Sequence, residues 1–299
     1  MVFNSEWSEY ISRCAVEAML YEVSATPKPG LVDRSNSGAH KDMNFFSFLS
    51  SSAALQQFFY QCAQKGTEFD SLDTIELLRQ IRGVGIEAEK KMYQATGGAN
   101  THKGLIFSLG IISAAAGKYF FNKTEYQVSI EKICRIISDM TKGIVEQELA
   151  GAGKKDNLTH GESLYLQYGF EGIRGEVEKG FITVRRTAFP LFLKLIEEKR
   201  GGINDVLVQV LLHLMMVTED SNVLARHDLN TLEYVRQKAA YALSLGGIYT
   251  AEGKAFIIEM DEDFIEKNIS PGGCADLLAV TIMLYSLYKT GCLGKSNFL

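Results

Sequence analysis

The segment of residues 25 to 43 carries the densest set of chemically active side chains near the N-terminus. It is polar, punctuated by Gly and Pro, and too long for a mere connection between helices. Prolines on both sides of Lys28 stiffen the segment and would hold the ammonium group in place for a phosphate. His40 adds an imidazole, and Asp33 and Asp42 add carboxylates, which are suitable ligands for Mg²⁺. The alternative is that the charges at positions 33 and 34 are solvated and that Asp42 caps the following helix.

A second polar loop, residues 96 to 104, runs directly into an apolar helix. Its glycines and its Asn and Thr side chains lie where free helix N–H groups collect, so the loop is a candidate phosphate cradle. Asn100, His102 and Lys103 belong to it. The loop does not match the G-x-x-x-x-G-K-[ST] motif, and no parallel-sheet pattern precedes it, which argues against a P-loop NTPase. A Thr-capped helix start after a glycine turn is the alternative.

Three further loops repeat this combination of glycine with ionisable groups at helix ends. The first is Thr159-His160-Gly161-Glu162, followed by Arg174-Gly175-Glu176, and its Glu162 also fits a capping box with Thr159. The second, residues 219 to 226, ends an apolar helix with acid, amide and base together. The third, Ser-Pro-Gly-Gly-Cys-Ala-Asp at residues 270 to 276, opens the C-terminal helix and could form an anion nest.

Any one of these five loops could be a turn whose polar side chains bind no ligand. Five of them in one helical chain favour a shared ligand site, because bundles build such sites where helix ends converge. His213 lies within the apolar run LLHLMM and is interpreted as structural. An alternative is a metal-dependent phosphohydrolase of the HD type, for which His160, the His227-Asp228 dipeptide and Asp276 superficially supply the ligands. That alternative leaves the glycine-rich loops unexplained.

Apolar residues spaced three and four apart predict the helices that must position these loops. Between Ser129 and Glu148 they fall on one stripe, with no strand-type alternation. About ten such helices are expected, so the predicted fold class is all-α. Pro190 lies inside one of them and predicts a bend near Thr187. The other helices are expected at residues 7–21, 44–64, 73–93, 103–121, 175–198, 205–217, 231–245, 251–266 and 275–288.

The chain as a whole, residues 1–299, is expected to form a single compact helical catalytic domain, because no linker, low-complexity tract or repeat divides it. Five scattered cysteines without a C-x-x-C pair indicate reduced core thiols. A net charge of -5 argues against general nucleic-acid binding. With no signal peptide and no apolar stretch of roughly 18 residues, we expect a soluble cytoplasmic protein that does not bind membranes.

Taken together, the five loops resemble the triphosphoribosyl-dephospho-CoA synthase family, whose members make the prosthetic-group precursor for the acyl carrier subunit of citrate lyase and of malonate decarboxylase. The resemblance runs from about Glu22 to Ala279. It is carried by Glu22-Val-Ser-Ala-Thr-Pro-Lys-Pro-Gly-Leu-Val-Asp33-Arg34-x-Asn36-x-Gly-Ala-His40-x-Asp42-Met43, Asn100-Thr-His102-Lys103-Gly104, His160-Gly-Glu162, Arg174-Gly-Glu176, Asp220-Ser-Asn222 and Gly272-Gly-x-Ala-Asp276.

The resemblance implies transfer of the triphosphoribosyl unit of ATP to the ribose 2′-hydroxyl of 3′-dephospho-CoA, with adenine as the leaving group. Breaking an N-glycosidic bond builds positive charge on the ribose, which a carboxylate can stabilise while an acid protonates the departing base. Three phosphates imply Mg²⁺ with Asp ligands and cationic side chains. The family also implies that the product passes to a holo-acyl-carrier-protein transferase, and a homodimer is a further expectation.

The resemblance implies roles for three groups of residues. Within the nucleotide-binding group, Lys28, Arg34 and Lys103 are assigned to the phosphates. The nucleotide-binding group is Lys28, Arg34, Asn36, Asn100, Lys103, Gly104, Arg174, Asn222, Arg226, Gly272 and Gly273. The catalytic group is Asp33, His40, Asp42, His102, His160 and Glu162. The metal-binding group is Asp42, Asp220 and Asp276.

Two other functions remain open at this point. The first is a helical Mg²⁺-dependent ribosyl hydrolase, similar in outline to ADP-ribosylglycohydrolases, in which water replaces the acceptor alcohol. The second is a nucleotide sensor that keeps the loops for binding alone.

Overall fold

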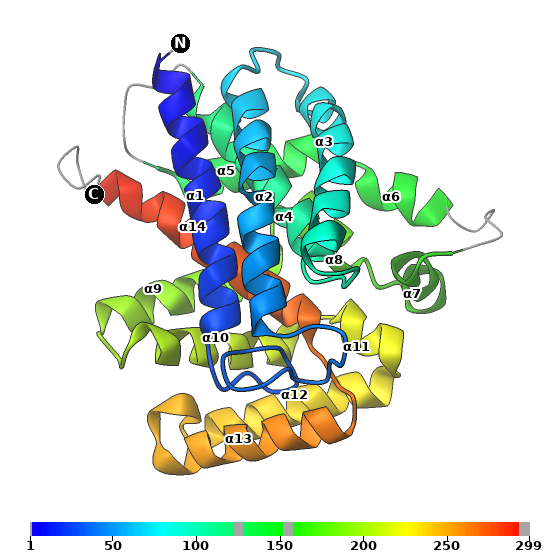
Figure 1. The fold of residues 1–299 in the computed structure, drawn as a ribbon, viewed down its shortest axis with the longest axis vertical. Coiled ribbons are helices and arrows are strands. Elements are labelled where there is room, and N and C mark those ends of the chain that lie inside the picture. The colour runs from blue at the N-terminus through cyan, green and yellow to red at the C-terminus, as the bar shows by residue number, and fades with distance from the viewer. Residues whose placement is uncertain (1, 122–127, 152–157, 293–299) are drawn as a thin grey trace.

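The computed structural model of this protein describes residues 2–121, 128–151 and 158–292, and within them every regular element is a helix. This confirms the predicted all-α class. Helices α1 (Val2–Ser24), α2 (Phe45–Thr67) and α3 (Thr74–Ala95) stand side by side, and α4 (Lys103–Phe120) packs against all three (Figure 1). The loop that joins α1 to α2 lies at one end of this group, next to α12 and α13 (Figure 1).

Helices α2 and α4 approach closely because each presents a glycine to the backbone of the other. A Cβ added to Gly66 would lie 2.1 Å from the carbonyl oxygen of Ala114, and one added to Gly117 would lie 2.2 Å from that of Ala63. No side chain fits at either position. This pairing fixes the position of α4 along its axis relative to α2, and therefore the position of the polar loop at the N-terminus of α4.

Two of the predicted helices are divided. The helix expected from Ser129 to Glu148 becomes α5 (Ile130–Met140) and α6 (Ile144–Glu148), because Gly143 adopts a positive φ of 79°. The helix expected at residues 175–198 becomes α8 (Gly172–Glu178), a π-helix (Val184–Ala188) and α9 (Phe189–Glu197). The π-helix lies directly before Pro190, where a bend was predicted.

The C-terminal part of the chain places α14 in the centre of the molecule. It consists of α10 (Ile203–Val217), α11 (Ser221–Arg226), α12 (Leu229–Ser244), a 3-10 turn (Gly247–Tyr249), α13 (Ala251–Glu266) and α14 (Gly272–Cys292). Helix α14 packs against α1, α4 and α10, and its N-terminus meets α11. The short helix α7 (His160–Tyr168) was predicted only through the capping box at its start, and α11 was not predicted from the sequence.

One hydrophobic core joins buried residues from Trp7 in α1 to Leu287 in α14. The rings of Trp7 and Phe120 stack in it with centroids 3.8 Å apart. A second, small apolar cluster of Val23, Val32, Met43 and Ala99 lies beneath the polar loops. Free, buried thiols are found at Cys14, Cys62, Cys134 and Cys274, as predicted, and the side chain of Cys292 lies outside the described residues. Among the described helices, none combines the length and the apolar character that crossing a membrane requires.

Candidate active site

The loop between α1 and α2 is organised around the buried carboxylate of Asp33. Its Oδ2 accepts a hydrogen bond from the backbone N–H of Lys28 at 3.1 Å, and its Oδ1 accepts from the N–H groups of Ser35 at 2.6 Å and Asn36 at 3.1 Å. The carboxylate therefore holds the loop in its fold. The side chain of Asn36 donates to Asp261 of α13 at 2.7 Å, which fastens the loop to that helix.

The ammonium group of Lys28 is buried and forms an ion pair with the buried carboxylate of Glu22 at the end of α1. Burial raises the pKa of Glu22, and the charge of Lys28 opposes that rise. A phosphate would have to compete with Glu22 for Lys28. Glu22 begins the first sequence segment of the family resemblance, but its ion pair with Lys28 was not predicted.

His102 lies at the N-cap of α4 with 1% of its surface exposed. Its Nδ1 is hydrogen-bonded to Ser51 Oγ at 2.7 Å, and its ring meets the ring of Phe48 edge-on at 4.7 Å. Burial and the nearby charge of Lys28 lower the pKa of His102 to about 3, so the imidazole is neutral at physiological pH. Its Nε2 atom is buried and has no hydrogen-bond partner among the described residues.

Asp220 joins the N-termini of α11 and α14. Its Oδ1 accepts from the backbone N–H groups of Asn222 at 2.9 Å and Val223 at 3.2 Å, and its Oδ2 accepts from that of Cys274 at 2.8 Å. A Cβ on Gly273 would lie 3.0 Å from this carboxyl group, so a glycine is needed for the approach. Burial raises the pKa of Asp220. These contacts give Asp220 a structural role at the junction of two helices.

Two neighbouring cavities open between these helix ends. The outer cavity has a volume of about 440 Å³ and the inner cavity a volume of about 120 Å³. The larger volume lies in the range typical of ligand pockets. The inner cavity is walled by residues of the α1–α2 loop and of α2, and the outer one by α8 and the end of α10. The residues that line both cavities are Asn100, Lys103, Gly104, Asn222 and Asp276.

Asp276 stands where the two cavities meet. Its Oδ2 packs so closely on Gly104 that a Cβ at that position would lie 1.9 Å from the oxygen. Burial, followed by repulsion from the carboxylates of Glu22 and Asp220, raises the pKa of Asp276 well above its usual range. This favours a protonated carboxyl group facing both cavities.

His40 and Arg226 lie at the mouth of the inner cavity. His40 Nε2 is hydrogen-bonded to Ser270 Oγ at 2.9 Å, and its Nδ1 lies 3.3 Å from Arg226 Nη2. Because the guanidinium can only donate, Nδ1 accepts and Nε2 carries the proton. Burial and the charge of Arg226 lower the pKa of His40, while Asp42 opposes the shift. Asp42 itself has a side chain that is 64% exposed.

The outer cavity has a rim of charged groups that were not assigned to the site from the sequence. Lys179 forms an ion pair with Glu171, and Glu176 accepts a hydrogen bond from Thr183 Oγ1 at 2.6 Å. Burial raises the pKa of both Glu176 and Glu219. Glu176 and Glu219 belong to loops that the sequence singled out, but no spacing rule indicated that they face one cavity.

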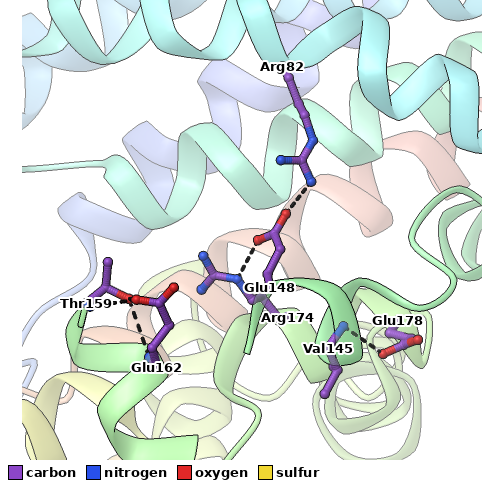
Figure 2. A network of polar contacts seen from close by, with 7 residues as sticks. All are labelled: Arg82, Val145, Glu148, Thr159, Glu162, Arg174 and Glu178. Atoms are coloured by element: carbon purple, nitrogen blue, oxygen red, sulfur yellow. Dashed lines mark hydrogen bonds and ion pairs between the residues drawn. The ribbon is translucent and has the colours of Figure 1, made fainter. Parts of the chain in front are cut away.

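Several predicted site residues line neither of these two cavities. Glu162 accepts hydrogen bonds from the N–H and hydroxyl of Thr159, which confirms the capping box (Figure 2). His160 is exposed at the start of α7. Arg174 and Arg82 both bind Glu148 (Figure 2), and these three residues line a separate, mainly apolar cavity. The other predicted site residues that line neither the inner nor the outer cavity are Asp33, Arg34, Asn36, Asp42 and Asp220. Helix α2 is capped by Asn44, so Asp42 does not cap it.

The three carboxylates assigned to Mg²⁺ do not converge. Asp42 is exposed, both oxygens of Asp220 accept backbone hydrogen bonds, and only Asp276 faces the cavities. Within residues 2–121, 128–151 and 158–292, no three His, Cys, Asp or Glu side chains form a metal-binding group. The described residues therefore do not fit a metal held mainly by the protein.

Comparison with known proteins decides the family. The chain matches the model of the ATP:dephospho-CoA triphosphoribosyl transferases over residues 8–293. The chain belongs to this family. It is 40% identical over 286 residues to the 2-(5''-triphosphoribosyl)-3'-dephosphocoenzyme-A synthase of Klebsiella pneumoniae, an alignment that covers 96% of this chain and 93% of the relative.

Two further relatives support membership of the triphosphoribosyl transferase family. A probable synthase of the same name from Lactiplantibacillus plantarum is 39% identical over 275 residues, covering 90% of this chain and 94% of the relative. Protein CitXG of Leuconostoc mesenteroides subsp. cremoris is 39% identical over 295 residues, covering 96% of this chain and 61% of the relative. No solved structure matches the chain. Membership confirms the resemblance inferred from the five loops, and the hydrolase, HD-type and sensor alternatives gain no support.

Proposed function

We propose that this protein transfers the triphosphoribosyl group of ATP to the 2′-hydroxyl of 3′-dephospho-CoA and releases adenine. The observation that carries the proposal is the family match, which spans nearly the whole chain. The joined cavities agree with it, because a transfer between two nucleotides needs two binding spaces that meet at the reacting atoms. Asp276 lies at that meeting point.

We assign proton transfer in this reaction to Asp276. As the bond between ribose C1 and the adenine nitrogen breaks, the protonated carboxyl group gives its proton to the departing base. The resulting carboxylate faces the positively charged ribose and stabilises it. It then takes the proton of the acceptor hydroxyl as the new C–O bond forms, so Asp276 returns to its starting state. The raised pKa of Asp276 supports this role.

We assign the phosphates to cations at the rims of the cavities. Lys103 forms an exposed ion pair with Glu89, and Lys179 forms one with Glu171. Exposed pairs of this kind contribute little stability, so a triphosphate can capture both ammonium groups. Arg226 provides a third exposed cation at the mouth of the inner cavity.

Magnesium belongs to this proposal only as the counter-ion that ATP brings with it. Mg²⁺ typically keeps several waters and binds one or two carboxylates together with substrate phosphates, so a protein cage is not required. When bound, it would neutralise part of the triphosphate charge. Calorimetry should then detect Mg²⁺ binding in the presence of ATP but not to the protein alone, and tight binding without nucleotide would contradict this assignment.

The cellular setting completes the proposal. The substrates are cytoplasmic metabolites, so we place the protein in the cytoplasm, and we expect its product to pass to a transferase that modifies an acyl carrier protein. We also propose a homodimer, which light scattering of the purified protein would test.

The activity is tested by incubating the protein with ATP and 3′-dephospho-CoA and analysing the products by mass spectrometry. We expect free adenine and one new species that combines dephospho-CoA with the triphosphoribosyl group. Adenine release that does not require dephospho-CoA would show a hydrolase instead. ATP binding without any adenine would show a sensor.

A further inference from the structure

Two residues that line the inner cavity carry buried polar atoms with no partner in the described part of the chain, His102 Nε2 and Thr101 Oγ1. The imidazole cannot turn away, because Ser51 binds its Nδ1 and the ring of Phe48 lies against it. Leaving a buried polar atom unpaired is costly, and native structures rarely do so without a functional reason. Both atoms therefore point to a ligand with hydrogen-bonding groups of its own.

The other walls of this cavity favour a flat, mainly apolar ligand. Val32 and Met43 of the small apolar cluster line it, and so does Phe48, which packs against that cluster. The volume of about 120 Å³ compares with the cavity of about 150 Å³ that accommodates benzene. Adenine is larger than benzene, so one of its rings fits this space while the rest of the base and the sugar extend through the mouth.

The charges of the inner cavity disfavour a phosphate inside it. Glu22 already compensates the charge of Lys28, and the protonated carboxyl group of Asp276 adds no positive charge, so neither offers a phosphate an unpaired cation. The other lining cations, Lys103 and Arg226, are exposed at the rim. A nucleotide would consequently enter with its base inside and its phosphates outside.

We infer that the inner cavity binds the adenine base of a nucleotide, with His102 Nε2 and the Thr101 hydroxyl as its hydrogen-bonding partners. Adenine offers ring nitrogens as acceptors and an amino group as donor, which suits the imidazole and the hydroxyl of two neighbouring residues that line the same cavity. The identity of the nucleotide rests on the proposed function. Because ATP and dephospho-CoA both carry adenine, the experiment must tell which of the two places its base here.

Four variants separate the contact with the base from general damage to the fold. His102→Asn keeps an amide group near the position of Nδ1, which can still bind Ser51, but lacks any atom at the position of Nε2. His102→Gln reaches that position and should restore the contact. Thr101→Val removes only the hydroxyl group. Thr141→Val removes a buried hydroxyl that donates to the carbonyl oxygen of Ile137 and lines neither cavity, so it serves as the matched control.

The first measurement is the affinity for free adenine, determined by calorimetry on the full chain. We expect His102→Asn and Thr101→Val each to weaken adenine binding roughly ten-fold, the effect of losing one hydrogen bond to a buried group. His102→Gln and Thr141→Val should stay within about three-fold of the unchanged protein. The KM values of His102→Asn and Thr101→Val then identify which substrate places its base in the inner cavity. A rise in the KM for ATP alone means that the adenine of ATP binds there. A rise in the KM for dephospho-CoA alone means that the adenine of dephospho-CoA binds there.

Unchanged adenine affinity in both His102→Asn and Thr101→Val, with unchanged melting temperatures, would overturn the inference. If His102→Asn does not fold, Thr101→Val still decides the question. Product formation from ATP and dephospho-CoA is measured in parallel with the unchanged protein. A normal product together with unaffected adenine binding in the variants would refute the base site and leave the proposed function standing.

Discussion

At the scale of single residues, the environment of a carboxyl group decides its role more than its residue type does. Asp33 and Asp220 use both oxygens to bind backbone N–H groups, so their function is to hold loops and helix ends together. Asp42 is largely exposed, and its Oδ1 lies 3.8 Å from His40 Nδ1. Asp276 has a raised pKa and faces both cavities, which makes it the best candidate for proton transfer among the four.

We therefore expect Asp276→Asn to lower kcat by about 100-fold or more, the usual contribution of a general acid and base. The amide has nearly the same shape and no charge, so the melting temperature should be unchanged or higher. Asp42→Asn is the matched control, and we expect its activity to stay within a few-fold of the unchanged protein. Steady-state kinetics and thermal unfolding check both expectations. If Asp42→Asn abolished turnover and Asp276→Asn did not, the roles assigned to these two carboxyl groups would be wrong.

His102 makes the stability of the protein depend on pH. Its pKa is lowered to about 3 in the folded protein, compared with roughly 6.5 in an unfolded chain. Between these values the unfolded chain binds a proton that the folded protein does not, so the free energy of unfolding falls as the pH drops below roughly 6.5. The loss from this one group approaches about 1.4 kcal/mol per pH unit.

Urea unfolding of the unchanged protein and of His102→Gln between pH 7 and pH 5 measures this contribution. We expect the stability of the unchanged protein to fall more steeply with decreasing pH, because the variant has no imidazole to protonate at this position. Parallel curves for the two proteins would mean that the folded protein accepts the proton on His102.

At the scale of helices, the position of the site depends on backbone contacts that glycine permits. Gly117→Ala would place a Cβ 2.2 Å from the carbonyl oxygen of Ala63, so α2 and α4 must separate. We expect a loss of about 1–3 kcal/mol in the free energy of unfolding, the usual cost of overpacking. Gly83→Ala is the matched control, since its Cβ would meet nothing within 4 Å in α3. It should stabilise the protein by roughly 0.5–1 kcal/mol, and equal effects of the two substitutions would contradict the packing described for α2 and α4.

The sequence predicts the long helices well because their apolar stripes are continuous, as in α2, α3 and α4. It fails where a single residue interrupts a stripe. Gly143 divides α5 from α6 through a positive φ, and Phe181 adopts a φ of 55° between α8 and the π-helix. Phe181 is fully buried, so tertiary packing determines its conformation and local preference does not. Helices as short as α11, with 6 residues, have no repeat long enough to detect.

At the scale of the whole molecule, the five loops indicated that a shared site exists but not which of their residues meet. All five loops contribute to the two cavities, including Lys28, His102, Glu176, Asn222 and Asp276. In the loop that begins at Thr159, the part around His160 contributes to neither cavity, and its helix α7 packs against α11. The role of Glu22 could not be predicted, since pairing with Lys28 and proximity to Asp276 arise only after folding.

The proposed reaction breaks the bond between ribose and adenine in ATP and leaves the triphosphate intact. ATP labelled in its γ-phosphate, incubated with the protein and 3′-dephospho-CoA, shows whether this bond is the one that breaks. We expect all of the label that leaves the ATP pool to appear in the dephospho-CoA product, with one unlabelled adenine released for each product molecule. Label released as phosphate or pyrophosphate, or a product without label, would refute the proposed transfer.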